Sequence, residues 1–234
     1  MIFATGDKHG EIDFRDLANK RFPLNRELTR DDYVIILGDW GVFWSPDAKS
    51  EKTKKYLLKF YNERRFTTLV IHGNHDNIPS MNECPEVPMF GSTVKQLSDN
   101  VFYLLNSHVY TINGKTFFVL GGGLSIDKLQ RREDFTWWKE EIPSYMEMKQ
   151  GFDLLSTMGN KVDYILTHAI FEDGYDYLFG DISGYKENDP MHKSLQVLKE
   201  TVNYKRWFCG HYHHDEYVES LKTQFLYHKV VKIE

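Results

Sequence analysis

Cysteine is scarce in this sequence. The 234 residues include only Cys84 and Cys209, which lie far apart and form no CxxC pair. This spacing favours neither a disulfide framework nor a zinc site built from thiolates. It is compatible with a reducing compartment, where free thiols persist.

A surplus of positive charge is also missing. Lysine and arginine together number 29 against 34 aspartates and glutamates, so the formal net charge is -5 at pH 7. Proteins with a broad footprint on DNA or RNA carry a basic face, and we therefore expect no extended nucleic-acid interface. A short nucleotide or a single phosphate is compatible with this balance, because a bound metal ion can supply positive charge locally.

Long apolar segments are absent as well. No apolar run approaches the roughly 20 residues that a helix needs to cross a bilayer, and the opening residues MIFATGDKHG lack the pattern of a signal peptide. We therefore expect a cytoplasmic protein without membrane association. Because no repeat, linker or low-complexity tract interrupts the sequence, residues 1–234 are predicted to form a single domain.

The sequence instead contains many short apolar runs. Three near the start each lead into a glycine and a polar residue: 2–5, 33–37 and 69–71. Such runs are typical of strands buried on both faces, which pair in parallel. Apolar residues at helical spacing in 14–18 and in 51–65 predict crossover helices between them, so the chain is expected to begin as a βαβαβ unit.

The second half of the sequence predicts further strands. The runs are 101–105, a hairpin of 108–112 and 116–120 around Asn113-Gly114, 164–166, 207–208, and a closing antiparallel pair of 216–218 with 225–233. The charged and aromatic residues 124–160, which include Trp137 and Trp138, are predicted to form a surface excursion with helical parts that acts as a lid. The expected fold class is α/β, with a two-layer β-sandwich core flanked by helices.

Residues able to bind a metal ion or to transfer a proton follow these strand-like runs. They are Asp7, His9, Asp39, Asn74, His75, His168, His211 and His213. Ligands of open α/β sheets bind beyond the carboxyl ends of the strands, so separate strands would deliver these side chains to one edge. Carboxylates, imidazoles and an amide suit Mn, Fe, Zn, Co or Ni better than Mg, which prefers oxygen.

Simpler interpretations exist for several of these residues. The aspartates could cap turns or helices, although this does not explain why two of them follow glycine at the end of an apolar run. His72 is expected to be a strand-end residue. His213 is favoured over His214 as a ligand, because the Gly-His-x-His spacing puts His211 and His213 on one side of an extended segment.

Taken in order, five segments resemble the calcineurin-like metallophosphoesterase family. They are Gly6-Asp7-Lys8-His9-Gly10, Gly38-Asp39, Gly73-Asn74-His75-Asp76, Thr167-His168 and Gly210-His211-Tyr212-His213. The stretch from Gly121 to Asp127, followed by Trp137-Trp138-Lys139-Glu140-Glu141, is similar to small bacterial and phage members. The resemblance implies two divalent transition-metal ions, with manganese favoured and iron, zinc, nickel or cobalt as alternatives.

The resemblance also assigns a role to each residue. Asp7, His9 and His213 would hold the first ion, Asn74, His168 and His211 the second, and Asp39 would bridge both. His75 would donate a proton to the leaving group, with Asp76 orienting its ring. A hydroxide bridging the two ions would then hydrolyse a phosphomonoester or phosphodiester, and the expected partner is a small phosphorylated substrate such as a nucleotide.

The second segment departs from the pattern of the Ser/Thr protein phosphatases. Those enzymes continue Gly-Asp with x-x-Asp-Arg, and the arginine grips the phosphate, whereas this chain reads Gly38-Asp39-Trp40-Gly41-Val42-Phe43-Trp44. A protein phosphatase is therefore the alternative rather than the first hypothesis. The phosphate grip is left open between Lys8, Arg131 and Arg132, which are candidates by charge.

A non-catalytic scaffold on the same fold is the remaining alternative. Its best support is aromatic: the two tryptophans of the excursion, and Tyr175, Tyr177 and Tyr185, which either wall a pocket or pack on the domain. Scaffold descendants lose ligands or the proton donor, and here the whole set is present. This alternative is therefore disfavoured.

Overall fold

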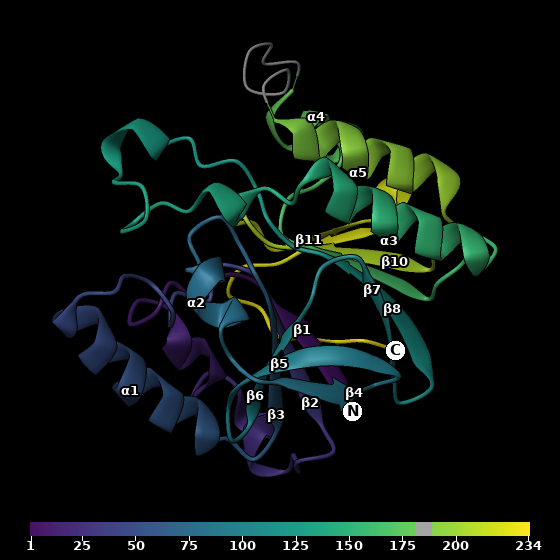
Figure 1. The fold of residues 1–234 in the computed structure, drawn as a ribbon. Helices are drawn as coiled ribbons and strands as arrows, with labels where there is room; N and C mark the ends of the chain where they lie inside the picture. Colours follow the sequence, from purple (N-terminus) through teal and green to yellow (C-terminus); the bar gives the residue numbers. More distant parts are fainter. Residues whose placement is uncertain (181–188) are drawn as a thin grey trace.

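Two β-sheets pack face to face between two layers of helices. The computed structural model describes residues 1–180 and 189–234. One sheet has seven strands and the other six, and helices cover the outer side of each (Figure 1). The predicted α/β class with a two-layer β core flanked by helices is confirmed.

The first sheet is parallel at its centre and antiparallel at its edges. Its parallel strands are β1 (Ile2–Thr5), β2 (Tyr33–Leu37), β3 (Thr67–Ile71) and β6 (Val101–Leu104), and its antiparallel strands are β4 (Glu86–Met89), β5 (Ser92–Ser98) and β13 (Val231–Lys232). The strand order is β13-β1-β2-β3-β6-β5-β4. The three strands predicted at the start of the chain are therefore parallel neighbours.

The two predicted crossover helices differ in the structure. The second forms as α1 (Ala48–Asn62), which is capped by Asp47, whose side chain accepts from two backbone N–H groups. The first, predicted over 14–18, forms only the short 3-10 turn η1 (Phe14–Leu17), and a second such turn, η2 (Pro23–Arg26), follows it. Its apolar spacing covers a single turn, too short for a stable α-helix.

The second sheet has the order β11-β12-β10-β9-β8-β7. Its parallel strands are β8 (Lys115–Leu120), β9 (Tyr164–Thr167), β10 (Arg206–Cys209) and β12 (Thr223–Phe225), with β7 (His108–Ile112) and β11 (Glu216–Val218) antiparallel at the edges. The predicted β7–β8 hairpin is confirmed. Asn113 and Gly114 both adopt the positive φ that its turn requires.

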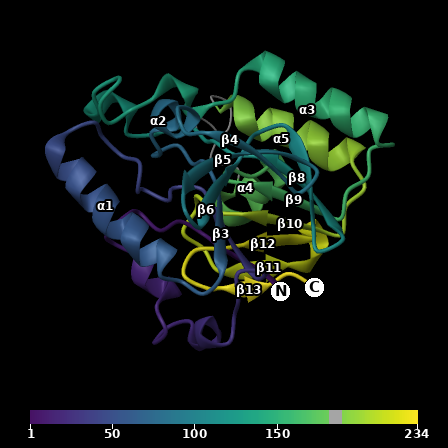
Figure 2. The same ribbon diagram turned by 60° about the horizontal axis from the view of Figure 1, so that its bottom comes forward.

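The predicted closing pair is wrong in its second strand. β11 pairs with β12 over 223–225, and the chain then leaves this sheet, so that β13 joins β1 of the first sheet. Both chain ends accordingly lie near each other in Figures 1 and 2. Leu226 and Ile233 thereby enter the core between the two sheets, which burial in a single hairpin would not achieve.

Successive residues of the central strands point to opposite faces of the sheet, and both faces are buried, so the strands are apolar throughout. Ile35 and Leu37 of β2 face the core between the sheets, while Val34 and Ile36 face the outer core under Leu57 and Tyr61 of α1. Both faces of the strand are thus covered, as expected for a central parallel strand. Each buried large aliphatic side chain contributes about 1.5–3 kcal/mol to this packing.

The predicted excursion over 124–160 contains two different parts. Residues 124–144 form a loop with the short turns η3 (Lys128–Gln130) and η4 (Lys139–Glu141), in which Trp137 and Trp138 are buried. α3 (Tyr145–Thr157) instead packs on the second sheet through Met148 and Leu155. The lid and the single domain stay predictions.

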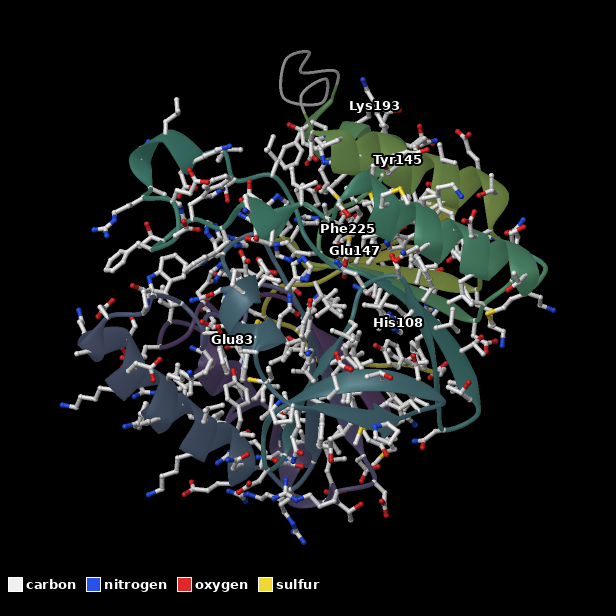
Figure 3. The ribbon with its side chains drawn as sticks, viewed as in Figure 1. Glu83, His108, Tyr145, Glu147, Lys193 and Phe225 are labelled. Carbon is white, nitrogen blue, oxygen red and sulfur yellow. The ribbon has the colours of Figure 1, made fainter. Side chains whose placement is uncertain are left out.

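Three more helices complete the outer layers. α2 (Ile78–Asn82) follows β3, while α4 (Glu172–Phe179) and α5 (Pro190–Thr201) lie with α3 over the second sheet. Figure 3 shows Tyr145 of α3 and Lys193 of α5 on this outer side. Within 1–180 and 189–234, every helix is too short or too polar to be a membrane-span candidate.

Candidate metal centre

The carboxyl ends of strands from both sheets meet at one place. Asp39 follows β2 of the first sheet, and His168 follows β9 of the second, yet His168 Nε2 lies 3.5 Å from Asp39 Oδ1. Asp7 follows β1, and its Oδ1 accepts a hydrogen bond from the backbone N–H of His211, which follows β10, at 2.9 Å. The convergence predicted from the strand ends is therefore present.

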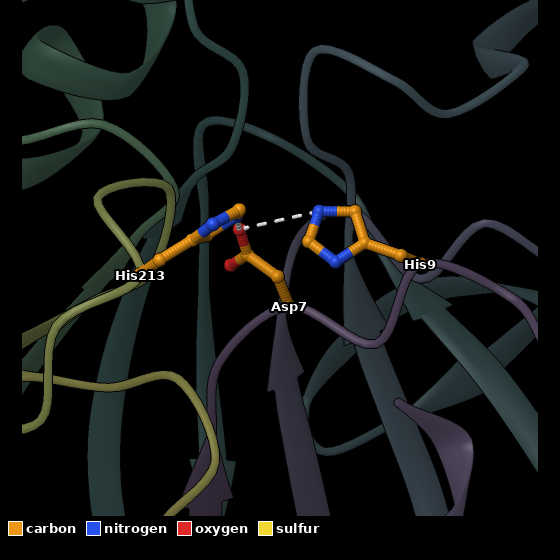
Figure 4. Close-up of side chains that lie close together, drawn as sticks. All are labelled: Asp7, His9 and His213. Carbon is orange, nitrogen blue, oxygen red and sulfur yellow. Dashed lines mark ion pairs between the residues drawn. The ribbon is translucent and has the colours of Figure 1, made fainter. Parts of the chain in front are cut away.

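Asp7, His9 and His213 form a first cluster (Figure 4). His213 Nε2 lies 3.2 Å and His9 Nε2 lies 3.9 Å from Asp7 Oδ2. One ligand atom from each residue falls within 4.8 Å of the others. Asp7 is fully buried, and its Oδ2 has no hydrogen-bond partner among the described residues. These are the three residues predicted to hold the first ion.

Neighbouring side chains hold this cluster in place. The Nδ1 of His9 lies 3.0 Å from a carboxylate oxygen of Asp13, and the ring of His213 stacks on Tyr227 with centroids 4.4 Å apart. A metal-binding histidine commonly has its other ring nitrogen held by a carboxylate in this way. The sequence reasoning missed Asp13 and Tyr227; the His-x-x-x-Asp spacing of His9 and Asp13 after β1 was a local signal for Asp13.

His168 and Asn74 form a second cluster. His168 Nε2 lies 2.9 Å from Asn74 Oδ1, and its Nδ1 donates to the Leu37 carbonyl at 2.7 Å, which leaves Nε2 facing the centre. The Asn74 amide nitrogen donates to the Ser125 hydroxyl at 3.0 Å, which turns the amide oxygen inward. His211 lies beside them, with its ring centroid 4.7 Å from that of His168.

Asp39 stands between the two clusters. Its Oδ2 lies 3.8 Å from His9 Nε2 of the first cluster, and its Oδ1 lies 3.5 Å from His168 Nε2 of the second. The residue is buried and adopts a positive φ of 48°. This is the placement that the predicted bridging role needs.

Two glycines are required for this close approach. A Cβ at Gly73 would overlap the Asp39 carboxylate, and a Cβ at Gly210 would overlap the Asp7 carboxylate. Both positions precede a predicted ligand. The glycines therefore let the loop backbones pack directly against the two central aspartates.

The electrostatics of the site favour a cation. Burial acts to raise the pKa values of Asp7 and Asp39, but the nearby His168 holds both below their usual range. Burial acts to lower the pKa of His168, yet the two carboxylates raise it to about 9. Burial and His168 lower the pKa of His211 to about 3. Two buried ionised carboxylates among imidazoles are a donor set that fits a divalent transition metal, which would displace the His168 proton.

His75 lies at the open side of the centre. Its backbone N–H donates to Asp39 Oδ1 at 2.9 Å, and its Nε2 lies 3.8 Å from Asp39 Oδ2. Burial and the nearby Arg131 lower the pKa of His75, against the opposing effect of Asp39. The ring is 22% exposed, so it can reach a bound molecule.

The predicted contact between Asp76 and the His75 ring is not formed. The Asp76 carboxylate accepts from the N–H groups of Gly73 at 2.9 Å and Gly41 at 2.8 Å, while His75 Nδ1 has no hydrogen-bond partner among the described residues. Burial, followed by the charge of Asp39, raises the pKa of Asp76 to about 7. Asp76 turns inward because the two loops after β2 and β3 need an acceptor, so it joins these loops instead of orienting the ring.

A cavity of about 540 Å³ borders the centre. It is lined by Asp39 and His75, by residues after β1 and at the start of α1, and by Trp44 and Arg131. Of the three basic candidates for the phosphate grip, only Arg131 faces this cavity. Lys8 is buried against Asp16, and Arg132 lies over the ring of Phe135.

The remaining aromatic and histidine candidates lie elsewhere. His72 is a buried strand-end residue whose ring bonds the Tyr103 hydroxyl at 2.8 Å. Tyr177 bonds Glu216 at 3.0 Å, and the ring of Tyr175 packs 4.7 Å from that of His192. Tyr185 lies outside the described residues.

Known proteins resemble this chain over most of its length. No curated protein gives a significant match. Among the solved structures that resemble it is the crystal structure of a phosphopantetheinyl hydrolase from Mycobacterium tuberculosis, at 16% sequence identity and a TM-score of 0.47, covering 97% of this chain and 87% of that one. The family model described as calcineurin-like phosphoesterase matches residues 1–215. The chain therefore belongs to the calcineurin-like phosphoesterase family.

Proposed function

We propose that this chain hydrolyses a phosphomonoester or phosphodiester with the help of two divalent metal ions. The family supports a hydrolase of the phosphoesterase type. The single observation that carries the two-ion proposal is Asp39, a buried carboxylate whose two oxygens face different ligand clusters, one through His9 and one through His168.

The ligand sets follow from these clusters. Asp7, His9 and His213 would hold one ion, Asn74, His168 and His211 the other, and Asp39 both. Two such cations would supply a nucleophilic water at neutral pH and positive charge for the phosphate oxygens. The mixture of oxygen and imidazole nitrogen suits manganese, iron, zinc, nickel or cobalt, and manganese is the first metal to test because the resemblance to the family favours it.

His75 is the group of this chain that would move a proton. Its ring lines the cavity and its backbone is tied to Asp39, so Nε2 is held beside the position of a reacting phosphate. A bound phosphate favours the charged imidazole, because an anion within a few Å raises the pKa of a histidine. Proton donation to the leaving oxygen by such a group typically contributes about 10²–10⁴-fold.

Metal removal and replacement test this proposal. The protein would be stripped with a chelator and assayed with p-nitrophenyl phosphate and bis-p-nitrophenyl phosphate after separate addition of Mn, Ni, Co, Zn or Mg. Turnover should return with metal and fall by more than about 100-fold in Asp39→Asn, with the exposed Asp31→Asn as a matched control. His75→Ala should keep its metal and lose about 10²-fold or more in kcat, unlike the control His214→Ala.

The outcomes separate the candidate functions. Two bound metal ions without turnover of either ester would restrict the substrate to something narrower than these probes. No metal binding and no turnover would refute the hydrolase and favour the scaffold. A protein phosphatase is the second candidate, favoured by an arginine, Arg131, that reaches the site from a different segment, and phosphopeptides would test it.

A further inference from the structure

The side chain of Arg131 is positioned at the edge of the cavity by three contacts. Its Nη2 pairs with Asp127 Oδ2 at 2.7 Å, and its Nη1 donates to the Thr136 carbonyl at 3.1 Å. The guanidinium carbon lies 5.1 Å from the centroid of the Trp44 ring. The side chain is only 14% exposed, so little conformational entropy remains to be lost when a ligand binds.

Arg131 also contacts the candidate proton donor. Its Nη2 lies 3.5 Å from His75 Nε2, which in turn lies 3.8 Å from Asp39 Oδ2. All three residues line the same cavity. A phosphate positioned between Asp39 and His75 would therefore lie within reach of the guanidinium.

We propose that Arg131 grips the phosphate of a small organic phosphoester whose leaving group occupies the cavity beside Trp44. This inference rests on the function proposed above. Arg131 would thereby take the place of the phosphate-binding arginine that follows Gly-Asp in the Ser/Thr protein phosphatases and is missing after Gly38-Asp39 in this chain. A guanidinium fork matches two phosphate oxygens at once, which a lysine cannot do.

The other contacts of Arg131 are compatible with this role. Its Nε is buried and has no hydrogen-bond partner among the described residues, so the donors that face a ligand are those of the terminal nitrogens, each of which carries two N–H groups. Asp127 is the carboxylate that a phosphate must compete with, and it is 37% exposed. Because solvent screens that pair, a phosphate bound in the cavity can take over the Nη2 donor.

The size and walls of the cavity indicate a small molecule. Its volume of about 540 Å³ falls within the range of small-molecule sites, roughly 300–1,000 Å³. Ile12, Val42 and Trp44 supply apolar wall, and Lys49 and Thr53 supply polar groups. His75 lines this space beside Asp39, so a leaving group that accepts its proton would extend into the cavity.

Steady-state kinetics and phosphate binding test the proposal together. Metal-loaded wild type, Arg131→Ala, Arg131→Lys and Arg132→Ala would be assayed with p-nitrophenyl phosphate, and inorganic phosphate would be titrated by calorimetry and as a competitive inhibitor. Arg131→Ala should lower kcat/KM and weaken phosphate binding by about 10- to 100-fold each, the loss expected for charge-assisted hydrogen bonds. Arg131→Lys should recover only part of this, and Arg132→Ala should stay within about twofold.

Trp44→Leu provides a second route to the same answer. If Trp44 acts by supporting the guanidinium, its substitution should weaken phosphate binding severalfold in the wild type and have little effect in Arg131→Ala, as in a double-mutant cycle. This comparison remains informative if Arg131→Ala folds poorly, because Arg131→Lys can replace it in the cycle.

The failures are distinguishable. If Arg131→Ala turns over substrate and binds phosphate as well as the wild type does, the role of Arg131 is overturned and the hydrolase proposal stays intact. Absence of turnover with every metal would refute the hydrolase, while the calorimetric titration would still decide whether Arg131 binds phosphate. Faster turnover of a phosphopeptide than of small esters would overturn the proposed substrate class.

Discussion

Two neighbouring clusters of aspartate and histidine differ in how their carboxylates are paired within the protein. Asp7, His9 and His213 form one, and Asp13, Asp16 and His228 form the other. Each combines at least one buried carboxylate with a half-exposed histidine. Composition and spacing therefore do not distinguish them.

The difference lies in what surrounds each carboxylate. Asp16 is bonded by Lys8 at 3.2 Å, by His228 at 2.8 Å and by Arg21, so its charge is already balanced by side chains of the chain itself. Asp7 Oδ2 has no hydrogen-bond partner among the described residues. Asp7 Oδ1 accepts from the His211 N–H, so the unsatisfied part of this buried carboxylate is Oδ2, which faces the imidazoles of His9 and His213. A buried carboxylate oxygen without a hydrogen bond is costly, and a bound cation would offset that cost.

The largest expected effect comes from neutralising Asp7, and Asp16 of the other cluster is the matched control. Asp7→Asn should lower metal affinity by more than about 100-fold, beyond the 10–100-fold typical of residues behind the ligands, and abolish metal-dependent turnover. Asp16→Asn should keep the metal content, as measured by elemental analysis after dialysis. Equal metal loss in both variants would show that the comparison is wrong.

The half-exposed histidines form a matched pair. His213 and His228 side chains are 47% and 49% exposed, but only His213 contacts Asp7. His213→Gln should weaken metal binding on the order of 100-fold, whereas His228→Gln should leave it within about twofold. Titration of the stripped proteins with Mn or Co would measure both, and a strong effect of His228→Gln would point to an ion in the other cluster.

Replacement of the buried Lys8 should lower the free energy of unfolding and leave metal binding unchanged. Lys8 is fully buried and contacts Asp16, so Lys8→Met leaves a buried carboxylate with fewer partners. We expect a loss of about 2 kcal/mol in the free energy of unfolding, measured by urea denaturation. The exposed Lys59→Met is the control, and metal content should stay unchanged in both.

The smallest effect is expected behind the second ligand cluster. Ser125 accepts a hydrogen bond from the Asn74 amide, and without it the amide is free to rotate its oxygen away from the centre. Ser125→Ala should weaken metal binding about tenfold, with the exposed Ser156→Ala as control. Unchanged affinity would show that His168 alone orients Asn74.

Much of the site was predictable because its residues immediately follow strands. Apolar runs, their glycines and the polar residues after them are local patterns, and parallel strands bring such residues to one edge. Asp7, Asp39 and His168 were predicted on this basis, and the structure brings them together. The same logic could not find Asp13 or Ser125, which act through a neighbour.

One helix that was not predicted, α5, has a clear local signal in the sequence. In α5, Met191, Leu195 and Leu198 recur at helical spacing, and all three are buried. The β4–β5 hairpin is harder to predict because it lies at a sheet edge and is only partly buried. Weak burial leaves weak periodicity in the sequence.

The sequence by itself determined the central strands, the glycines beside the ligands, and the family to which the chain belongs. Only the tertiary structure decided that β13 returns to the first sheet, that Asp76 bonds two loops and not the His75 ring, and that Arg131 rather than Lys8 or Arg132 faces the cavity. The physical reason is that the position where a strand ends depends on residues close to it in the sequence. The partner of a buried polar side chain, in contrast, depends on which distant backbone or charge the folded chain brings within hydrogen-bonding distance.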